Sequence, residues 1–178
     1  MKNPELVIWV DDEDHELGRL GRDVVHDKSH LLLHREAMVI LFANPEHTDF
    51  WLQQRSPNKK QYPNFWTLGV TCHVNSDDIN ATDPEGYLNA ARREGPEELG
   101  ISIANPEIVK KEIIETTVNR ALAAIIVAEC FSTPIPDGDE VVRVERFNKE
   151  TLEDIRDKLT PGALHCLKII GLIGEEHE

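Results

Sequence analysis

Short apolar runs separated by turn residues recur along most of the chain. They are rich in Val, Ile, Leu and aromatic residues, which is the pattern of buried or half-buried β-strands. Acidic and Asn-Pro turns, at residues 11–14 and 44–47, separate the first runs. The predicted strands span residues 6–10, 37–42, 50–54, 66–74, 108–115, 122–131 and 141–147.

Helical patterns follow later in the chain. Asp83 before Pro84 is typical of a capped helix start, and Gly100 after Leu99 is typical of a helix end. Residues 149–159 and 161–173 are the other predicted helices. Strands in a mixed order with one central and two terminal helices predict an α+β fold.

Length and composition fit one domain. The chain has 178 residues, of which 40% are hydrophobic and 29% are charged. This length buries a sufficient core without disulfides, and the three cysteines lack the spacing of a disulfide framework. We therefore expect a single domain over residues 1–178 in a reducing compartment.

The net charge and the lengths of the apolar segments indicate which partners and which cellular location to expect. A net charge of -14 disfavours nucleic acid, but a local cluster of cations or a bound metal would still allow a small anion to bind. The first residues lack the parts of a signal peptide, and no apolar stretch is long enough to span a bilayer. We expect a cytoplasmic protein without nucleic-acid or membrane partners, and the sequence leaves a homodimer open.

Three glutamates of the central predicted helix form a candidate metal site. Glu94, Glu97 and Glu98 stand at positions i, i+3 and i+4, which share one helix face. Their charges repel one another, and a divalent cation that prefers oxygen ligands, Mg²⁺ or Mn²⁺, would offset this repulsion. The alternative for such a pattern is a solvated acidic helix face.

The surroundings of these glutamates resemble the Nudix box, Arg-Glu-x-x-Glu-Glu-x-Gly, over about residues 73–101. Glu85 also lies at the family's distance before Arg93. The resemblance implies a Nudix hydrolase built as an α/β/α sandwich, with a mixed β-sheet and the Nudix helix at the active site. It also implies that Glu94, Glu97 and Glu98 are catalytic and hold the metal, and that Arg93 supports a carboxylate or binds the substrate.

The sequence departs from the Nudix box at two places. Ile79 stands at the position of the leading glycine, and residues 75–82 resemble an insertion. Gly95-Pro96 replaces an apolar position, and a proline inside a helix costs about 3 kcal/mol because it removes a hydrogen bond. We therefore expect the helix to kink or to restart at Pro96, and a restart would leave Glu94 outside the metal site.

A longer stretch, residues 9–101, resembles the type I isopentenyl diphosphate isomerase branch of the Nudix superfamily. The matching motifs are Trp9-Val10-Asp11, Leu17-Gly18, Val25-His26, Leu33-His34-Arg35, Leu52-Gln53-Gln54-Arg55, Lys59-Lys60 and Asn64-Phe65-Trp66-Thr67. The resemblance implies that His26, His34 and His73 bind a divalent metal. His30 extends a four-residue spacing between two of them, which would gather these histidines on one face if a helix formed there.

Arg55, Lys59 and Lys60 form a dense cationic cluster in an acidic chain. The isomerase resemblance implies that Arg55 and Lys59 bind the substrate's diphosphate, and charge-assisted hydrogen bonds suit such an anion. The alternative is a basic loop on the surface.

The catalytic residues of the isomerases do not align with this sequence. Their cysteine position falls on Thr71, and the displacement of Cys72 by one residue in a strand predicts a side chain pointing away from the cavity. Their Glu-x-Glu pair falls on Asn119 and Ala121, and no tryptophan follows residues 160–161. Isomerase activity is therefore not expected.

The leading hypothesis is a metal-dependent hydrolase, in which water attacks a diphosphate group of a small molecule. Two alternatives remain open. One is an isomerase with a rebuilt site, in which Cys72 and a carboxylate such as Glu115 take the lost roles. The other is a non-catalytic Nudix domain that binds a diphosphate or a nucleotide.

Overall fold

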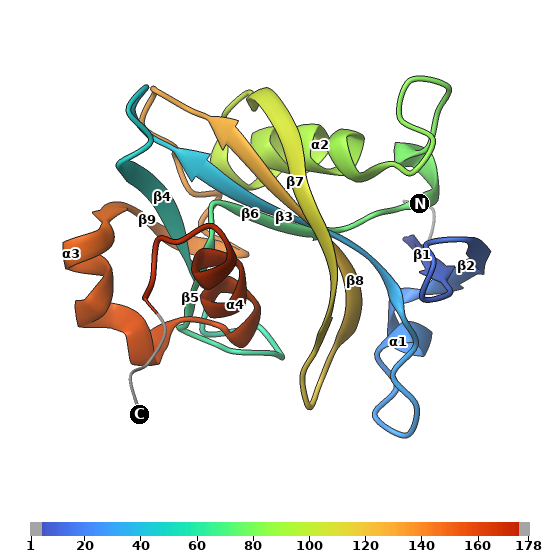
Figure 1. The fold of residues 1–178 in the computed structure, drawn as a ribbon. Helices are drawn as coiled ribbons and strands as arrows, with labels where there is room; N and C mark the ends of the chain where they lie inside the picture. The colour runs from blue at the N-terminus through green and yellow to red at the C-terminus, as the bar shows by residue number, and fades with distance from the viewer. Residues whose placement is uncertain (1–4, 175–178) are drawn as a thin grey trace.

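A mixed β-sheet of nine strands organises residues 5–174, the part of the chain that the computed structural model describes. Helix α2 covers one face of the sheet, and α3 and α4 lie over the other (Figure 1). The strands are β1 (Leu6–Val10), β2 (Glu16–Gly21), β3 (His34–Phe42), β4 (Asp49–Arg55), β5 (Trp66–Leu68), β6 (Val70–His73), β7 (Ala104–Glu115), β8 (Arg120–Glu129) and β9 (Val141–Asn148). The helices are α1 (Arg22–Val25), α2 (Tyr87–Leu99), α3 (Lys149–Leu152) and α4 (Pro161–Ile169), with 3-10 turns η1 (Ser76–Asp78) and η2 (Glu153–Lys158). The expected α+β class and layered sandwich are confirmed.

Strand β3 is central because both of its faces are covered, and all nine of its residues are buried. It pairs in parallel with β8 and antiparallel with β1, β4 and β6. Successive side chains alternate between the two cores, as a strand requires. Ala37 and Val39 pack in the core under α2, whereas Met38 and Ile40 pack in the core under α4.

The start of helix α2 differs from the expected one. The side chain of Asp83 accepts hydrogen bonds from the backbone N–H groups of Gly86 and Asn89, at 3.1 and 2.8 Å. The first helical residue is nevertheless Tyr87, since Gly86 takes a left-handed conformation with φ of 83°. The N-cap residue is therefore Gly86 and Pro84 precedes the helix, so the predicted start at Asp83 and Pro84 is wrong, although Asp83 still binds a backbone N–H of the first turn.

Helix α2 continues through Gly95 and Pro96, so the expected restart at Pro96 is wrong. The helix closes at Gly100, which has a φ of 62° and donates to the carbonyl of Pro96 at 3.2 Å. Gly95 is required by a close approach, since a Cβ there would lie 2.8 Å from Cγ1 of Ile103. The segment after the helix, which contains Ile103, thus packs directly against the backbone of Gly95.

Several predicted elements have other bounds in the structure. The strand predicted over residues 66–74 is divided into β5 and β6, which pair with β4 and β3. The division falls at Gly69, where a Cβ would lie 2.6 Å from Cβ of Leu41. Strand β2 and helix α1 were not predicted because β2 is short of apolar residues. The helix predicted over 149–159 is divided into α3 and η2, and α4 ends at Ile169. The remaining strands match within a few residues.

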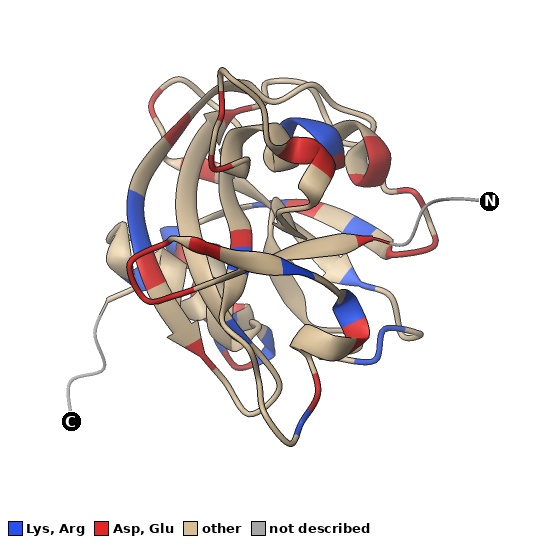
Figure 2. Ribbon diagram, turned by 90° about the vertical axis from the view of Figure 1, so that its right-hand side faces the viewer, with Lys and Arg blue, Asp and Glu red and all other residues tan. Residues whose placement is uncertain are grey.

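Charge is spread over the molecule. In the view of Figure 2, red acidic segments stand close to most of the blue basic ones, on strands, loops and helices alike. In the described part of the chain, no helix is long and apolar enough to cross a membrane.

Candidate active site

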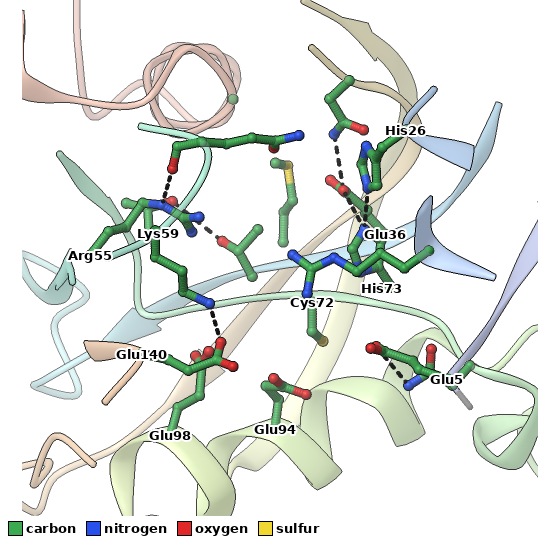
Figure 3. A pocket seen from close by; sticks show the side chains of 18 of the residues that line it. Glu5, His26, Glu36, Arg55, Lys59, Cys72, His73, Glu94, Glu98 and Glu140 are labelled. Atoms are coloured by element: carbon green, nitrogen blue, oxygen red, sulfur yellow. Dashed lines mark hydrogen bonds and ion pairs between the residues drawn. The ribbon is translucent and has the colours of Figure 1, made fainter. Parts of the chain in front are cut away.

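A cavity of about 460 Å³ opens beside the C-terminal half of α2 and extends past β6 to both faces of the sheet. Met38, from the face under α4, and Glu94, from α2, both line it. Figure 3 shows Glu94 and Glu98 rising from the helix, with Arg55 and Lys59 on one side and a group of histidines on the other. The structure thus brings together the glutamates, cations and histidines that the sequence singled out.

The three glutamates of α2 differ in burial. Glu98 is buried, Glu94 is largely buried, and the side chain of Glu97 is 61% exposed at the rim. Burial, followed by the charge of Glu94, raises the pKa of Glu98 to about 7. Burial also raises the pKa of Glu94. The neutral amide of Gln53 donates to Glu98 at 3.2 Å. Two buried carboxylates that resist ionisation fit a divalent cation with oxygen ligands, such as Mg²⁺ or Mn²⁺.

Arg93 holds this part of the helix in place. Its Nε and Nη2 donate to the two oxygens of Asp78 at 2.9 and 3.1 Å, and Nη2 also donates to the carbonyl of His73 at 3.2 Å. It pairs with Glu94 as well. These contacts favour a supporting role for Arg93 over direct substrate binding. Asp78 is buried on η1, within the segment interpreted as an insertion, and was not singled out from the sequence.

Arg55 and Lys59 lie on the opposite wall of the cavity from the helix (Figure 3). Nε of Arg55 donates to the carbonyl of Gln61 at 3.1 Å, which fixes the guanidinium. Burial lowers the pKa of Arg55 from its ordinary value. Lys59 pairs with Glu140, another cavity residue that the sequence did not indicate. This loop is therefore part of the cavity and not a plain surface loop.

His26, His34 and His73 lie together, although no helix gathers them. Their ring centroids are 4.9, 5.0 and 5.2 Å apart. His26 follows the short helix α1, His34 begins β3, and His73 ends β6. No helix forms through His30, because the chain turns after α1 and leaves His30 exposed. The group is assembled by strand pairing, which the four-residue spacing does not reveal.

Cys72 and Thr71 both line the cavity, so the expectation that Cys72 points away from it is wrong. The cavity reaches both faces of β6, and neighbouring side chains on opposite faces can therefore both contribute. Burial, and then the charge of Glu94, raise the pKa of Cys72 well above its ordinary value, which keeps the thiol protonated.

The other isomerase positions carry different groups. Asn119 donates its amide to Oε1 of Glu36 at 2.9 Å, and Ala121 is fully buried. At Gly162, a Cβ would lie 2.7 Å from Cε of Met38, so the methionine occupies the space beside this glycine. Position 162 itself therefore contributes no aromatic side chain to the cavity.

Two curated proteins resemble this chain, and no family model matches it. A protein of Pseudomonas aeruginosa, named an uncharacterized Nudix hydrolase, is 33% identical over 167 residues, which are 93% of this chain and 92% of that protein. A prenyl-diphosphate phosphatase of Methanosarcina mazei is 36% identical over 98 residues. That match covers 55% of this chain and 51% of the phosphatase.

Solved structures share the fold. The crystal structure of DR0079 from Deinococcus radiodurans has a TM-score of 0.71 at 20% identity, covering 93% of this chain and 98% of that chain. A Nudix hydrolase from Alicyclobacillus acidocaldarius has a TM-score of 0.62 at 12% identity, covering 75% and 89%. With the Pseudomonas relative, these likenesses establish that the chain belongs to the Nudix hydrolase family. It is accordingly an enzyme of the pyrophosphohydrolase type, in a family that generally uses divalent metal ions.

Proposed function

We propose that the protein hydrolyses a prenyl diphosphate, or a closely similar diphosphate with an apolar group, in a reaction that depends on Mg²⁺ or Mn²⁺. The observation that carries this proposal is the composition of the cavity, which joins a charged end to a less polar end. The phosphatase relative from Methanosarcina mazei supports the prenyl group.

The charged end of the cavity suits a diphosphate. Arg55 is held by Gln61 with the rest of its guanidinium free to form charge-assisted hydrogen bonds to phosphate oxygens. Lys59 can exchange its partner Glu140 for a phosphate, because both groups border the same space. Two cations on one wall and carboxylates on the other would hold a diphosphate between them.

The carboxylates of α2 are the proposed metal ligands. A divalent cation bound by Glu94, Glu97 and Glu98 would neutralise charge on the diphosphate and lower the pKa of the attacking water. Arg93 keeps Glu94 oriented through its own contacts with Asp78. Gln53 orients Glu98 with a hydrogen bond that does not neutralise its charge.

The less polar end of the cavity suits a short hydrocarbon tail. Met38 and Ile114 line it, together with the hydroxyl groups of Thr71 and Thr160 and the backbone of Gly162. Apolar lining that removes a tail from water contributes about 25 cal/mol for each Å² buried.

Isomerisation is the second candidate, because the Cys72 thiol lines the cavity. It is disfavoured because the two positions of the isomerase glutamates carry an amide and a methyl group, at Asn119 and Ala121. Neither group can add or remove a proton at carbon.

The decisive experiment is a substrate panel with the purified chain. Isopentenyl, dimethylallyl, geranyl and farnesyl diphosphates are compared with ADP as substrates. Each substrate is assayed in the presence of Mg²⁺, of Mn²⁺ or of a chelator. Phosphate release and isomeric products are measured together. We expect metal-dependent release of phosphate from at least one prenyl diphosphate, faster than from ADP, and its loss in Glu98→Gln. Preference for ADP would exclude the prenyl substrate, and isomerised product without phosphate release would establish the second candidate.

A further inference from the structure

The side chain of Met38 lies between the less polar end of the cavity and the core under α4. Met38 is a residue of β3 that lines the cavity, and it is buried. It also belongs to the core that contains Ala163 and Leu167 of α4. Its thioether is therefore the surface that an apolar group entering from the cavity would meet.

Gly162 leaves the space that the end of this methionine occupies. A Cβ at position 162 would lie 2.7 Å from Cε of Met38 and 3.8 Å from its Sδ. Outside the first turn of α4 itself, the described atoms within 4 Å of that point belong to Met38 alone. The missing side chain at position 162 thus decides how far the thioether is set back from the cavity.

Cys166 fixes the thioether at a second point. Its thiol donates to Sδ of Met38 at 3.4 Å, and both side chains are buried. Gly162 and Cys166 stand at positions i and i+4 of α4, so both face Met38 from the same side of the helix. Methionine is usually an adaptable side chain, because it has several rotatable bonds. Contacts at both Sδ and Cε hold this one in place, which gives the cavity a wall of defined position.

The hydroxyl groups beside Met38 bind one another. Thr71 is the cross-strand partner of Met38, so the two side chains lie on the same face of the sheet. The hydroxyl of Thr160 donates to that of Thr67 at 3.2 Å, and the hydroxyls of Thr67 and Thr71 lie 3.4 Å apart. An apolar group placed next to them leaves these hydroxyls paired. This end of the cavity can therefore bind a hydrocarbon without leaving a polar group unsatisfied.

We propose that Met38 is a specificity-determining residue, which limits the length of the hydrocarbon tail that the cavity accepts. This inference rests on the proposed hydrolysis of a prenyl diphosphate. With the diphosphate between Arg55 and Glu94 (Figure 3), the tail would extend past β6 towards Met38. A longer tail would meet the thioether, which cannot withdraw because it already fills the space at Gly162. Gly162 is the positioning residue of this wall.

Met38→Ala should widen the range of tails that the enzyme accepts. The change removes Cγ, Sδ and Cε, and so opens space for part of one further prenyl unit. A single methylene group in an apolar pocket is discriminated by about 10- to 200-fold. The ratio of kcat/KM for geranyl diphosphate to that for dimethylallyl diphosphate should therefore rise by about tenfold or more in Met38→Ala.

Gly162→Ala tests the wall from the other side. A methyl group there must displace Cε of Met38 away from α4 and into the cavity, so the same ratio should fall by about tenfold. In the Met38→Ala background, the atoms that this methyl group would meet are absent. Gly162→Ala should then leave the ratio unchanged, which separates a steric wall from a general effect on the helix.

The assay uses the full chain with Mg²⁺ and with dimethylallyl, geranyl and farnesyl diphosphates. Calorimetry in chelator measures the affinity for the same compounds, so that recognition of the tail is recorded without turnover. The matched control is Ile40→Ala. Ile40 is on the same strand and in the same core as Met38, but it is not among the described residues that line the cavity. This control should lose stability and keep the wild-type ratio.

A second variant covers the case in which Met38→Ala does not fold. Met38→Leu conserves most of the volume and shortens the side chain, so it should shift the ratio in the same direction by a smaller factor. Circular dichroism verifies that each variant is folded.

The proposed tail-length limit and the proposed hydrolysis fail in different ways. If prenyl diphosphates are hydrolysed but the folded Met38 variants keep the wild-type ratio, the wall is excluded and the hydrolysis stands. If no phosphate is released but the relative affinities shift as expected, the wall stands and the hydrolysis is excluded. A wild type that neither binds nor hydrolyses a prenyl diphosphate would overturn both. An equal shift in Ile40→Ala, or an effect of Gly162→Ala that persists without the Met38 side chain, would also overturn the wall.

Discussion

Burial separates residues of the same type in this site. Glu97 and Glu98 are neighbours on one helix, yet the first is mostly exposed and the second is 7% exposed. Burial, followed by the charge of Glu94, raises the pKa of Glu98 to about 7. An ionised Glu98 therefore destabilises the metal-free folded protein, and a bound cation would remove this destabilisation.

Glu98→Gln should therefore stabilise the metal-free protein at high pH. The folded-state pKa exceeds the ordinary value of 4.5, so stability is greatest below about pH 4.5 and is lost as the pH rises towards 7. This corresponds to at most about 3 kcal/mol, at 1.36 kcal/mol per pKa unit. Urea unfolding in chelator should show a large gain for Glu98→Gln at pH 8 and a smaller gain at pH 5.5. The exposed control, Glu97→Gln, should change little, and equal gains at both pH values would contradict this assignment.

Arg55→Ala and Lys59→Ala should each weaken the binding of inorganic diphosphate, because both cations border the cavity. The expected loss is about 1.5–3 kcal/mol for each charge-assisted contact, nearer the lower value for Lys59, which must first leave Glu140. Calorimetric titration measures this loss. Lys60→Ala is the matched control, since Lys60 is exposed on the same loop and should bind like the wild type. Similar losses in all three variants would indicate a general effect of charge.

At the scale of elements, most strands followed from the apolar runs, and α2 followed from its carboxylates and Gly100. What the sequence did not reveal depends on pairing between distant segments. Glu36 lies next to His73 only because the two residues pair across β3 and β6. Asp78 is part of the site only because it accepts a hydrogen bond from Arg93. The prediction that the Cys72 side chain points away from the cavity was wrong for a similar reason. The alternation of side chains along a strand does not reveal that a cavity reaches both faces of that strand.

The end of α2 provides a direct test of packing. Gly95→Ala places a methyl group about 2.8 Å from Cγ1 of Ile103, and such overpacking costs about 1–3 kcal/mol. Alanine also favours helix by about 1 kcal/mol over glycine. Unfolding measurements should therefore show a net loss of stability in the wild type. In an Ile103→Ala background, where the clash is removed, the same change should become stabilising. A loss of the same size in both backgrounds would exclude the clash as its cause.

At the scale of the whole molecule, β3 contributes side chains to both cores, so neither core can persist when the other unfolds. Residues 1–178 are therefore proposed to unfold in one cooperative transition. Tryptophans on three strands report it, namely Trp9 on β1, Trp51 on β4 and Trp66 on β5. Their fluorescence and the far-ultraviolet circular dichroism should have coincident urea midpoints. Separate midpoints would instead reveal more than one folding unit.

The parallel pairing of β3 with β8 also sets an order of events during synthesis. β3 meets antiparallel partners early in the chain, but its β8 edge stays unpaired until residues up to Glu129 have left the ribosome. Closing so long a loop carries an entropic cost that slows parallel pairing. Until then, the nascent chain exposes an apolar strand edge that can pair with other chains. β8 is thus the strand that covers this edge of β3 and protects the nascent chain from aggregation.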